Sequence, residues 1–189
     1  MAERNALPSR KPLRLRSHDY SLPGDYFLTL CISQKKCVLG HVEGGVVRLN
    51  RLGQTVRSIW EQIPQDYKNV KLDEYIVMPN HVHGIVSIRH EDWNVGDGSH
   101  PVPTSRAHVG DGSHPVPMSI PEIVRRFKTL TTKRYRQGVD EGMWTDSGKQ
   151  LWQRSYFDRV IRNRDELNQI RIYMSNNPLR WGEGVRVQR

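Results

Sequence analysis

Residues Tyr75–Ile88, YIVMPNHVHGIVSI, consist of two runs of β-forming residues on either side of a Pro-Asn dipeptide. This pattern predicts two paired strands joined by a tight turn. Because successive side chains of a strand point to opposite faces, we expect His81 and His83 side by side on one face, with Val82 pointing into a core. Two imidazoles held in this way can bind one divalent cation. Two ordinary core histidines would produce the same pattern, so both interpretations stay open at this point.

The rest of the chain supplies the other elements of a domain built from one sheet and its helices. The expected elements are a strand at 26–33, a hairpin at 38–41 and 46–49, a helix that Asn50 caps and Pro64 stops, strands at 70–78 and 81–88, a helix at 119–137 with a capping-box start, a strand at 151–161, and a helix from 163 to about 177. This order suits one antiparallel sheet with helices packed on it. We therefore expect an α+β, ferredoxin-like fold.

The length of 189 residues suits one domain with a hydrophobic core. We assign this domain to residues 20–182, preceded by a basic arm at 1–19 and followed by a frayed tail at 183–189. Within the domain, the sequence VGDGSHPVP occurs twice among Gly, Pro, Asp and Ser residues that offer no apolar face. This composition predicts a flexible duplicated insertion at about 91–118.

The formal net charge of +9 is concentrated at the two ends of the chain. Residues 1–20 carry five Lys/Arg against two Asp/Glu, and residues 121–189 carry fifteen against eight. This distribution favours a polyanionic partner such as nucleic acid. The chain opens with no signal peptide, and no apolar run approaches the ~20 residues that a membrane span needs. We therefore expect a cytoplasmic protein without membrane contact, in which Cys31 and Cys37 are free thiols.

The last predicted helix offers groups that complete a site around the strand histidines. If the apolar stripe of this helix faces the sheet, Tyr173 and Asn177 are neighbours on one shoulder of the stripe, because they lie four residues apart. Two imidazoles with oxygen ligands suit Mg²⁺ or Mn²⁺, whereas no set of residues has the spacing of a zinc site. Tyrosine can act as a covalent nucleophile, although its pKa of ~10 requires help from a nearby cation or from the geometry imposed by DNA.

Each of these helix residues also has an ordinary structural interpretation. Tyr173 could be a packing residue, and Tyr135 and Tyr156 are rival nucleophiles. Asn177 precedes Pro178 at the end of a helix, where asparagine is common as a cap.

Three segments of the chain resemble a known enzyme family. His81-Val82-His83 matches the His–hydrophobic–His motif of the HUH endonucleases. The succession of YIVMPNHVHGI, LWQRSYFDRVIRNRDEL and IRIYMSNNP resembles the single-tyrosine transposases, in particular the branch of REP-associated tyrosine transposases. The resemblance runs from about Tyr20 to Trp181, apart from the duplicated insertion.

The resemblance implies a ferredoxin-like sheet, metal ligation by His81 and His83, and attack by Tyr173 on single-stranded DNA. It implies Asn177 as a third ligand, at a position where many relatives outside this branch have Gln. The expected activity is that of a Mg²⁺- or Mn²⁺-dependent endonuclease and strand transferase, a transposase that acts on hairpin-forming repeat DNA through a 5′-phosphotyrosine. Single-stranded or hairpin DNA is the expected partner, a homodimer is the assembly that family members often form, and no nucleotide cofactor is needed.

The basic arm and the basic helix are the expected contacts to DNA phosphates, and an aromatic-basic stretch is the expected contact to bases. The candidates are Arg10, Lys11, Arg14, Arg16, Arg125, Arg126, Lys128, Lys133, Arg134, Trp152 and Arg154. Trp152 fits a core position better than a contact to bases, and each basic residue taken singly fits a solvated charge better than a specific contact. Two other functions stay open: a non-catalytic or weakly catalytic DNA-hairpin-binding protein derived from a transposase, and a relaxase or replication initiator, although proteins of that last class are usually longer.

Overall fold

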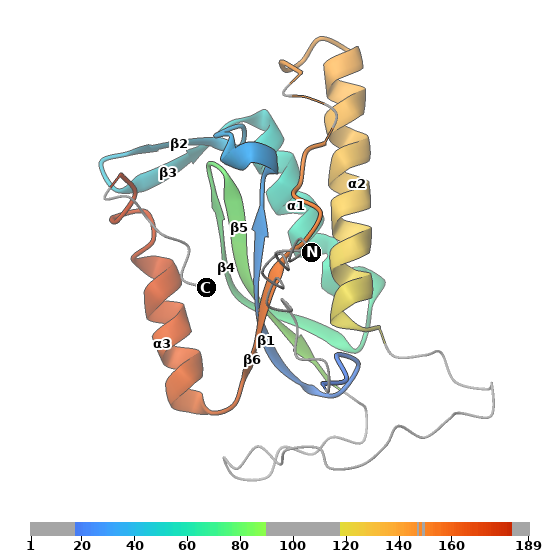
Figure 1. Cartoon of the computed structure of the whole chain (residues 1–189), viewed down its shortest axis with the longest axis vertical. Helices are drawn as coiled ribbons and strands as arrows, with labels where there is room; N and C mark the ends of the chain where they lie inside the picture. Colours follow the sequence, from blue (N-terminus) through green and yellow to red (C-terminus); the bar gives the residue numbers. More distant parts are fainter. Residues whose placement is uncertain (1–17, 90–117, 147, 149, 183–189) are drawn as a thin grey trace, which may run out of the picture.

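The computed structural model of the chain describes residues 18–89, 118–146, 148 and 150–182. Its centre is a four-stranded sheet in which every neighbouring pair of strands is antiparallel, in the order β4-β5-β1-β6 (Figure 1). The strands are β1 (Gly24–Cys31), β4 (Val70–Met78), β5 (His81–Ile88) and β6 (Phe157–Ile161). The first and last strands are thus adjacent, and the hairpin β4–β5 completes the sheet on the other side of β1.

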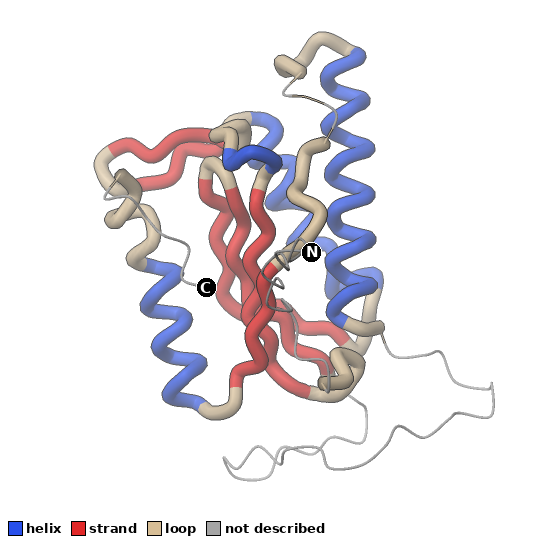
Figure 2. Tube along the Cα trace, in the orientation of Figure 1, coloured by secondary structure: helices blue, strands red, loops and turns tan. Residues whose placement is uncertain are grey.

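Helices cover both faces of this sheet. Helices α1 (Arg51–Asp66) and α2 (Ile120–Asp140) pack on one face, and α3 (Arg164–Ser175) packs on the other (Figure 2). A separate hairpin of β2 (Gly40–Glu43) and β3 (Val46–Leu49) and a short 3₁₀ turn, η1 (Ser33–Lys35), lie between β1 and α1 in the chain. The predicted α+β, ferredoxin-like fold is confirmed.

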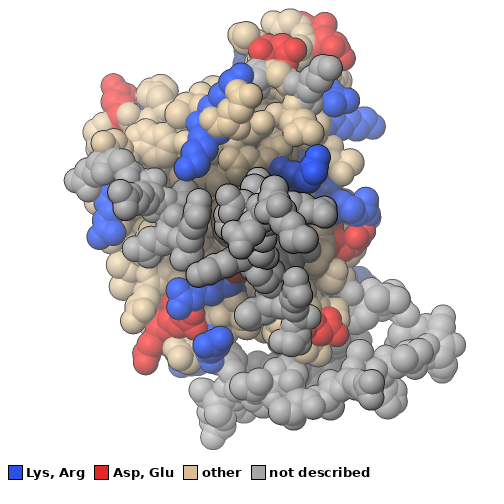
Figure 3. Space-filling view, viewed as in Figure 1, with Lys and Arg blue, Asp and Glu red and all other residues tan. Residues whose placement is uncertain are grey.

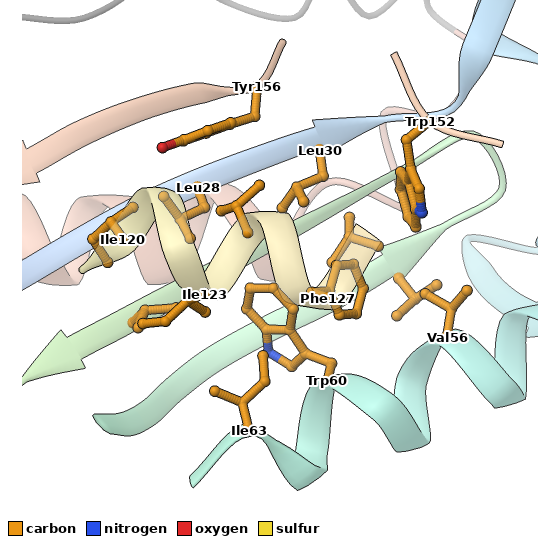
Figure 4. Packing of buried hydrophobic residues seen from close by; sticks show 14 of the residues in the cluster. Leu28, Leu30, Val56, Trp60, Ile63, Ile120, Ile123, Phe127, Trp152 and Tyr156 are labelled. Carbon is orange, nitrogen blue, oxygen red and sulfur yellow. The ribbon is translucent and has the colours of Figure 1, made fainter. Parts of the chain in front are cut away.

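The main core lies between the sheet and the α1–α2 layer. Alternate residues of β1 and β5 point into it, and the indole of Trp60 on α1 meets the ring of Phe127 on α2 edge-on, with ring centroids 5.2 Å apart (Figure 4). Both side chains are almost completely buried. This period of two explains why the β5 sequence is apolar on one face and can carry polar groups on the other.

The predicted strand at 151–161 is wrong in its first half, because the regular ladder with β1 covers only Phe157–Ile161. Before it, Trp152 forms an isolated bridge with Ile32, and its indole Nε1 donates to the Thr131 hydroxyl of α2 at 2.7 Å. The Lys128 ammonium donates to the backbone carbonyls of Gln153 and Ser155, at 2.8 and 2.9 Å. These contacts with α2 hold the segment away from a regular ladder.

The predicted boundaries of two helices also needed correction. Helix α1 continues past Pro64 to Asp66, because its last turn closes through the bond from the Tyr67 amide to the Ile63 carbonyl, which does not need the missing N–H of proline. Ser119 precedes α2 but forms no side-chain cap, so the predicted capping box is absent. Helix α2 also runs on to Asp140. The Asn50 cap is confirmed, since its side chain accepts from the Gly53 amide at 2.9 Å.

Several predictions fall outside the described residues. They concern nearly all of the arm at 1–19, the duplicated insertion at 91–118 apart from Met118, the tail at 183–189, and the candidate contacts Arg10, Lys11, Arg14 and Arg16. In the part of the chain that the structure describes, no helix has the length and apolar character to cross a membrane.

Candidate active site

His81 and His83 occupy the start of β5 and point to the face covered by α3. Their ring centroids are 4.5 Å apart, and both side chains are buried, at 3% and 1% exposure. Cys31 and Thr29 of β1 are their partners in the sheet. The strand alternation therefore does what the sequence predicts and brings the two imidazoles together on one face.

Hydrogen bonds orient both rings through their Nδ1 atoms. His81 Nδ1 lies 2.6 Å from the side-chain oxygen of Asn80, and His83 Nδ1 lies 2.8 Å from the hydroxyl of Thr29. The opposite atom of His81, Nε2, is buried and has no hydrogen-bond partner in the described part of the chain. His83 Nε2 faces the phenol of Tyr173, with 3.5 Å between the nitrogen and the oxygen.

Helix α3 brings this tyrosine to the histidines. The Asn163 side chain caps the helix by accepting from the Glu166 amide at 2.8 Å. On the sheet-facing side, Ile170 and Met174 are buried against Ile85 and Ile161. The packing of this apolar stripe leaves Tyr173 on its shoulder, where the phenol ring meets the His83 ring with centroids 5.4 Å apart.

Asn177 lies in the turn that follows α3, and its side chain is 2% exposed. The helix C-cap is Asn176, so Asn177 is not the cap residue that its position before Pro178 also suggested. Its side-chain oxygen has no hydrogen-bond partner among the residues described, while its amide is close enough to the Tyr173 phenol to lower the pKa of that phenol. Tyr173 and Asn177 are thus neighbours, as their i, i+4 spacing predicts.

Burial sets the protonation of the site. Burial, followed by the nearby Lys35 ammonium, lowers the pKa of His81 to about 4. Burial, followed by the charge of His81, lowers the pKa of His83 well below its usual range. Both imidazoles are therefore neutral near pH 7, with lone pairs available to a cation. Burial also raises the pKa of Tyr173, against the opposing effects of Asn177 and the Arg180 charge, so the phenol is protonated.

The donor set fits a divalent cation that accepts nitrogen and oxygen ligands. Two buried polar atoms with no hydrogen-bond partner, His81 Nε2 and Asn177 Oδ1, belong to this cluster, and such atoms are costly unless something satisfies them. In the described residues no group of three or more His, Cys, Asp or Glu side chains could hold a metal. Asn177 carries an amide oxygen, which is a ligand type that such cations accept.

The rival tyrosines lie elsewhere. Tyr135 is buried on α2, and its hydroxyl donates to Asp146 at 3.1 Å. Tyr156 is buried in the main core on the α1–α2 side of the sheet (Figure 4). Of the three candidate nucleophiles, Tyr173 is the one that the fold brings to the histidines.

The predicted DNA contacts among the described residues have different surroundings. Arg125 pairs with Glu122, Arg126 lies over the Tyr67 ring at 5.3 Å, and Lys128 is bound to backbone carbonyls. Lys133, Arg154 and the buried Trp152 line a groove of about 770 Å³ between α2 and residues 150–154, and Lys128 lines it as well. Arg134 is exposed beside this groove, and its guanidinium donates to Gln137 at 3.2 Å.

The sequence did not indicate four side chains that surround the histidines. Thr29 and Asn80 bind the two rings, Phe27 stacks on His83 with centroids 5.2 Å apart, and Trp181 lies 6.2 Å from His81. Asn80 directly precedes His81, and this adjacency was a usable signal. The roles of Thr29 and Phe27 follow only from the register of β1 against β5, which no local pattern gives.

Comparison with known proteins supports the architecture and identifies a relative. No family model matches the chain. A solved structure described as a REP-associated tyrosine transposase bound to a REP hairpin has the same fold, with a TM-score of 0.56 and 16% identity over 89% of this chain and 75% of that one. An uncharacterized protein of Haemophilus influenzae is 33% identical over 175 residues, which make up 91% of this chain and 89% of that protein. The chain therefore belongs to the family of this Haemophilus influenzae protein and has a transposase-like fold.

Proposed function

We propose that this protein is a metal-dependent endonuclease and strand transferase for single-stranded DNA, with Tyr173 as its nucleophile. One observation carries the proposal: α3 brings the half-buried Tyr173 to the buried His81 and His83 of β5, with the Tyr173 oxygen 3.5 Å from His83 Nε2. The buried Asn177 lies in the turn directly after α3, next to Tyr173. Two neutral imidazoles, an amide oxygen and a phenol are the groups that a metal-assisted attack on a phosphodiester needs.

His81, His83 and Asn177 are the residues that would hold a Mg²⁺ or Mn²⁺ ion. Such an ion, when bound, polarises the scissile phosphate and lowers the cost of charge on the attacking oxygen. The raised pKa of Tyr173 supports this requirement, because a buried phenol at neutral pH is a weak nucleophile without a neighbouring cation.

The reaction at Tyr173 is a transesterification. The phenolic oxygen forms a bond to phosphorus, and the bond from phosphorus to the 3′ oxygen breaks. The phenol loses one proton and the departing oxygen gains one, so the products are a 5′-phosphotyrosine and a free 3′-hydroxyl. One phosphodiester replaces another, and a second 3′-hydroxyl can therefore reverse the step and join new strands without a nucleotide cofactor. Partial burial of Tyr173 limits the access of water to this intermediate.

Hairpin-forming repeat DNA is the proposed substrate. The structural neighbour with the same fold is described in complex with a REP hairpin, and the sequence resembles that branch of transposases. Lys and Arg side chains gather along α2 and beside the groove at 150–154 in Figure 3. We expect a polyanionic strand to lie in this groove, where the Gln153 amide donates to the carbonyl of Cys31 in β1, the strand next to β5.

Covalent capture tests the chemistry. A single-stranded palindromic oligonucleotide labelled at its 3′ end, incubated with Mn²⁺ or Mg²⁺, should transfer the label to the protein in a denaturing gel. EDTA and the Tyr173→Phe change should both abolish the transfer, and Tyr135→Phe is the matched control that should leave it intact. An undiminished adduct in Tyr173→Phe would assign the nucleophile elsewhere. Hairpin binding by the unaltered protein with no adduct at any metal concentration would favour the non-catalytic DNA-hairpin-binding protein.

The groove has its own test in the absence of metal. Lys133→Ala combined with Arg154→Ala should weaken oligonucleotide binding about equally for all sequences and lower the slope of log affinity against log salt by roughly two. Arg57→Ala on α1, outside the groove, is the control, because it removes a similarly exposed charge. Equal losses in the control and the double variant would rule out a specific role for the groove.

A further inference from the structure

Asn80, in the turn between β4 and β5, forms two side-chain hydrogen bonds of different kinds. Its amide nitrogen donates to the backbone carbonyl of Lys35 at 3.3 Å, and its amide oxygen lies 2.6 Å from His81 Nδ1. A carbonyl can only accept, so the Lys35 contact fixes which end of the Asn80 amide faces the histidine. The end that faces the ring is the oxygen, which also can only accept.

This arrangement determines which nitrogen of His81 carries the proton. A neutral imidazole has one N–H, and the Asn80 oxygen requires it at Nδ1. Nε2 is then left with a bare lone pair, and this is the buried atom that has no hydrogen-bond partner within the described residues. An imidazole without such a partner favours the Nε2–H form, which cannot bind a cation through Nε2. We propose that Asn80 is a positioning residue that fixes the Nδ1–H tautomer of His81 and thereby keeps Nε2 ready for a divalent cation.

The turn at η1, which contains Lys35, holds the carbonyl that accepts this bond. Gln34 and Lys35 both have positive φ, at 56° and 54°, which is a costly conformation for residues other than glycine. The turn is tied to the same loop from the other side, because the Ile32 amide donates to the Asn80 carbonyl at 2.8 Å and the Lys35 amide donates to the Ile32 carbonyl at 3.0 Å. Backbone and side chain of Asn80 are therefore both held by residues 32–35.

His83 provides the contrast within the same site. Its Nδ1 partner is the Thr29 hydroxyl at 2.8 Å, and a hydroxyl can donate as well as accept. Thr29 therefore orients the ring without dictating a tautomer in the way that an amide oxygen does. The two histidines are matched in burial and strand position and differ in this partner, so Thr29→Val is an internal control for changes at Asn80.

The direct test is ¹⁵N NMR of the histidine rings in the metal-free protein. In the unaltered protein and in Asn80→Asp, which retains an acceptor, His81 should be protonated at Nδ1 and unprotonated at Nε2. In Asn80→Ala, the Nε2–H form of His81 should become the major one, while the signals of His83 stay unchanged. Thr29→Val should leave the tautomer of His81 as it is. An Nε2–H signal for His81 in the unaltered protein, or an unchanged Nδ1–H signal in Asn80→Ala, would overturn the proposal.

The second readout is Mn²⁺ affinity, which rests on the proposed function. Asn80→Ala should weaken Mn²⁺ binding by roughly 10- to 100-fold, the usual cost of losing an outer partner of a ligating histidine. Asn80→Asp should retain affinity within a few-fold. If the unaltered protein bound no Mn²⁺, the proposed metal site would fail, whereas the NMR result would still decide whether Asn80 fixes the tautomer. Equal Mn²⁺ affinity in Asn80→Ala and the unaltered protein would remove the link from tautomer to cation.

Discussion

The two faces of the sheet differ in what they contribute. On the α1–α2 face, a continuous core joins both helices to the sheet through large side chains such as Trp60 and Phe127 (Figure 4). On the α3 face, the buried hydrophobic cluster is limited to Ile85, Ile161, Ile170 and Met174. The sheet positions beside this cluster hold buried polar side chains, His81 and His83 among them.

Strand β5 shows how one short segment serves both purposes. Val82, Gly84 and Val86 alternate with His81 and His83, so each residue type reaches one face only. The chemistry-bearing side chains are held by a strand whose other face is anchored in the main core. We infer that packing on the α1–α2 face contributes most of the free energy of unfolding. On the α3 face, polar side chains of the proposed site occupy positions that apolar side chains could otherwise fill.

The largest expected effect on stability comes from the core of the α1–α2 face. Trp60→Ala removes a fully buried indole and should lower the free energy of unfolding by about 3–5 kcal/mol, because both the transfer energy and the cavity contribute. Denaturant titration measures this loss. Mn²⁺ affinity per folded molecule should be retained, because Trp60 does not contact the histidines or Tyr173.

Met174→Ala on α3 is the matched change on the other face. It removes a buried side chain from the smaller cluster and should cost only about 2 kcal/mol, at the low end for such a change, because fewer neighbours surround it. Unlike Trp60→Ala, it should reduce adduct formation by folded protein, since Tyr173 is the adjacent residue. Equal stability losses together with equal activity losses would contradict the division between the faces.

A comparable effect is expected at Gly84, the glycine that directly follows the histidine pair. A Cβ at this position would lie 2.3 Å from the Trp60 ring, and a fully buried indole has little room to move. Gly84→Ala should therefore destabilise the protein by about 1–3 kcal/mol through overpacking. The double variant Gly84→Ala/Trp60→Leu tests this cause. In the Trp60→Leu background, Gly84→Ala should lower the free energy of unfolding much less, because the indole is absent. Additive losses in the double variant would place the requirement for glycine elsewhere.

The sequence predicted the features of this molecule that depend on local periodicity. The alternation in β5 predicted the shared face of His81 and His83, and the spacing of Tyr173 and Asn177 predicted that they are neighbours, although Asn177 lies in the turn after α3. These patterns need only the geometry of a single element. The fold class followed because the order of strands and helices leaves few compact arrangements.

The predictions that were wrong concern features that depend on contacts between distant segments. LWQRSYFDRVI has the composition of a continuous strand, but contacts with α2 take its first half out of the sheet. Arg125, Arg126 and Lys128 belong to the same basic helix as Lys133, yet they have partners within the protein. No single-element pattern indicates which cations of a basic helix bind groups of their own protein.

The smallest expected effect concerns the ion pair that helps to dock α3. The Arg171 guanidinium donates to both carboxylate oxygens of Asp73, which lies at the register shift of β4 between Leu72 and Tyr75. Because the hydrophobic cluster on this face is small, we expect this two-point contact to contribute measurably to the stability with which α3 docks on the sheet. Asp73→Asn should cost about 1 kcal/mol, a modest value because both side chains are partly exposed to solvent.

The pH dependence of this pair separates its effect from a general loss of stability. The hydrogen bond from Arg171, the largest cause, lowers the pKa of Asp73, so its carboxylate stabilises the folded protein above the ordinary carboxyl value of ~4. That contribution is lost as the pH falls through the lowered pKa of the folded state. Amide hydrogen exchange in α3 should therefore quicken below about pH 4 relative to exchange in β1 and β5, beyond the intrinsic effect of pH on exchange. Asp73→Asn should show faster exchange in α3 at neutral pH and lack this additional change in acid, and a uniform effect on all elements would assign the ion pair to global stability instead of α3 docking.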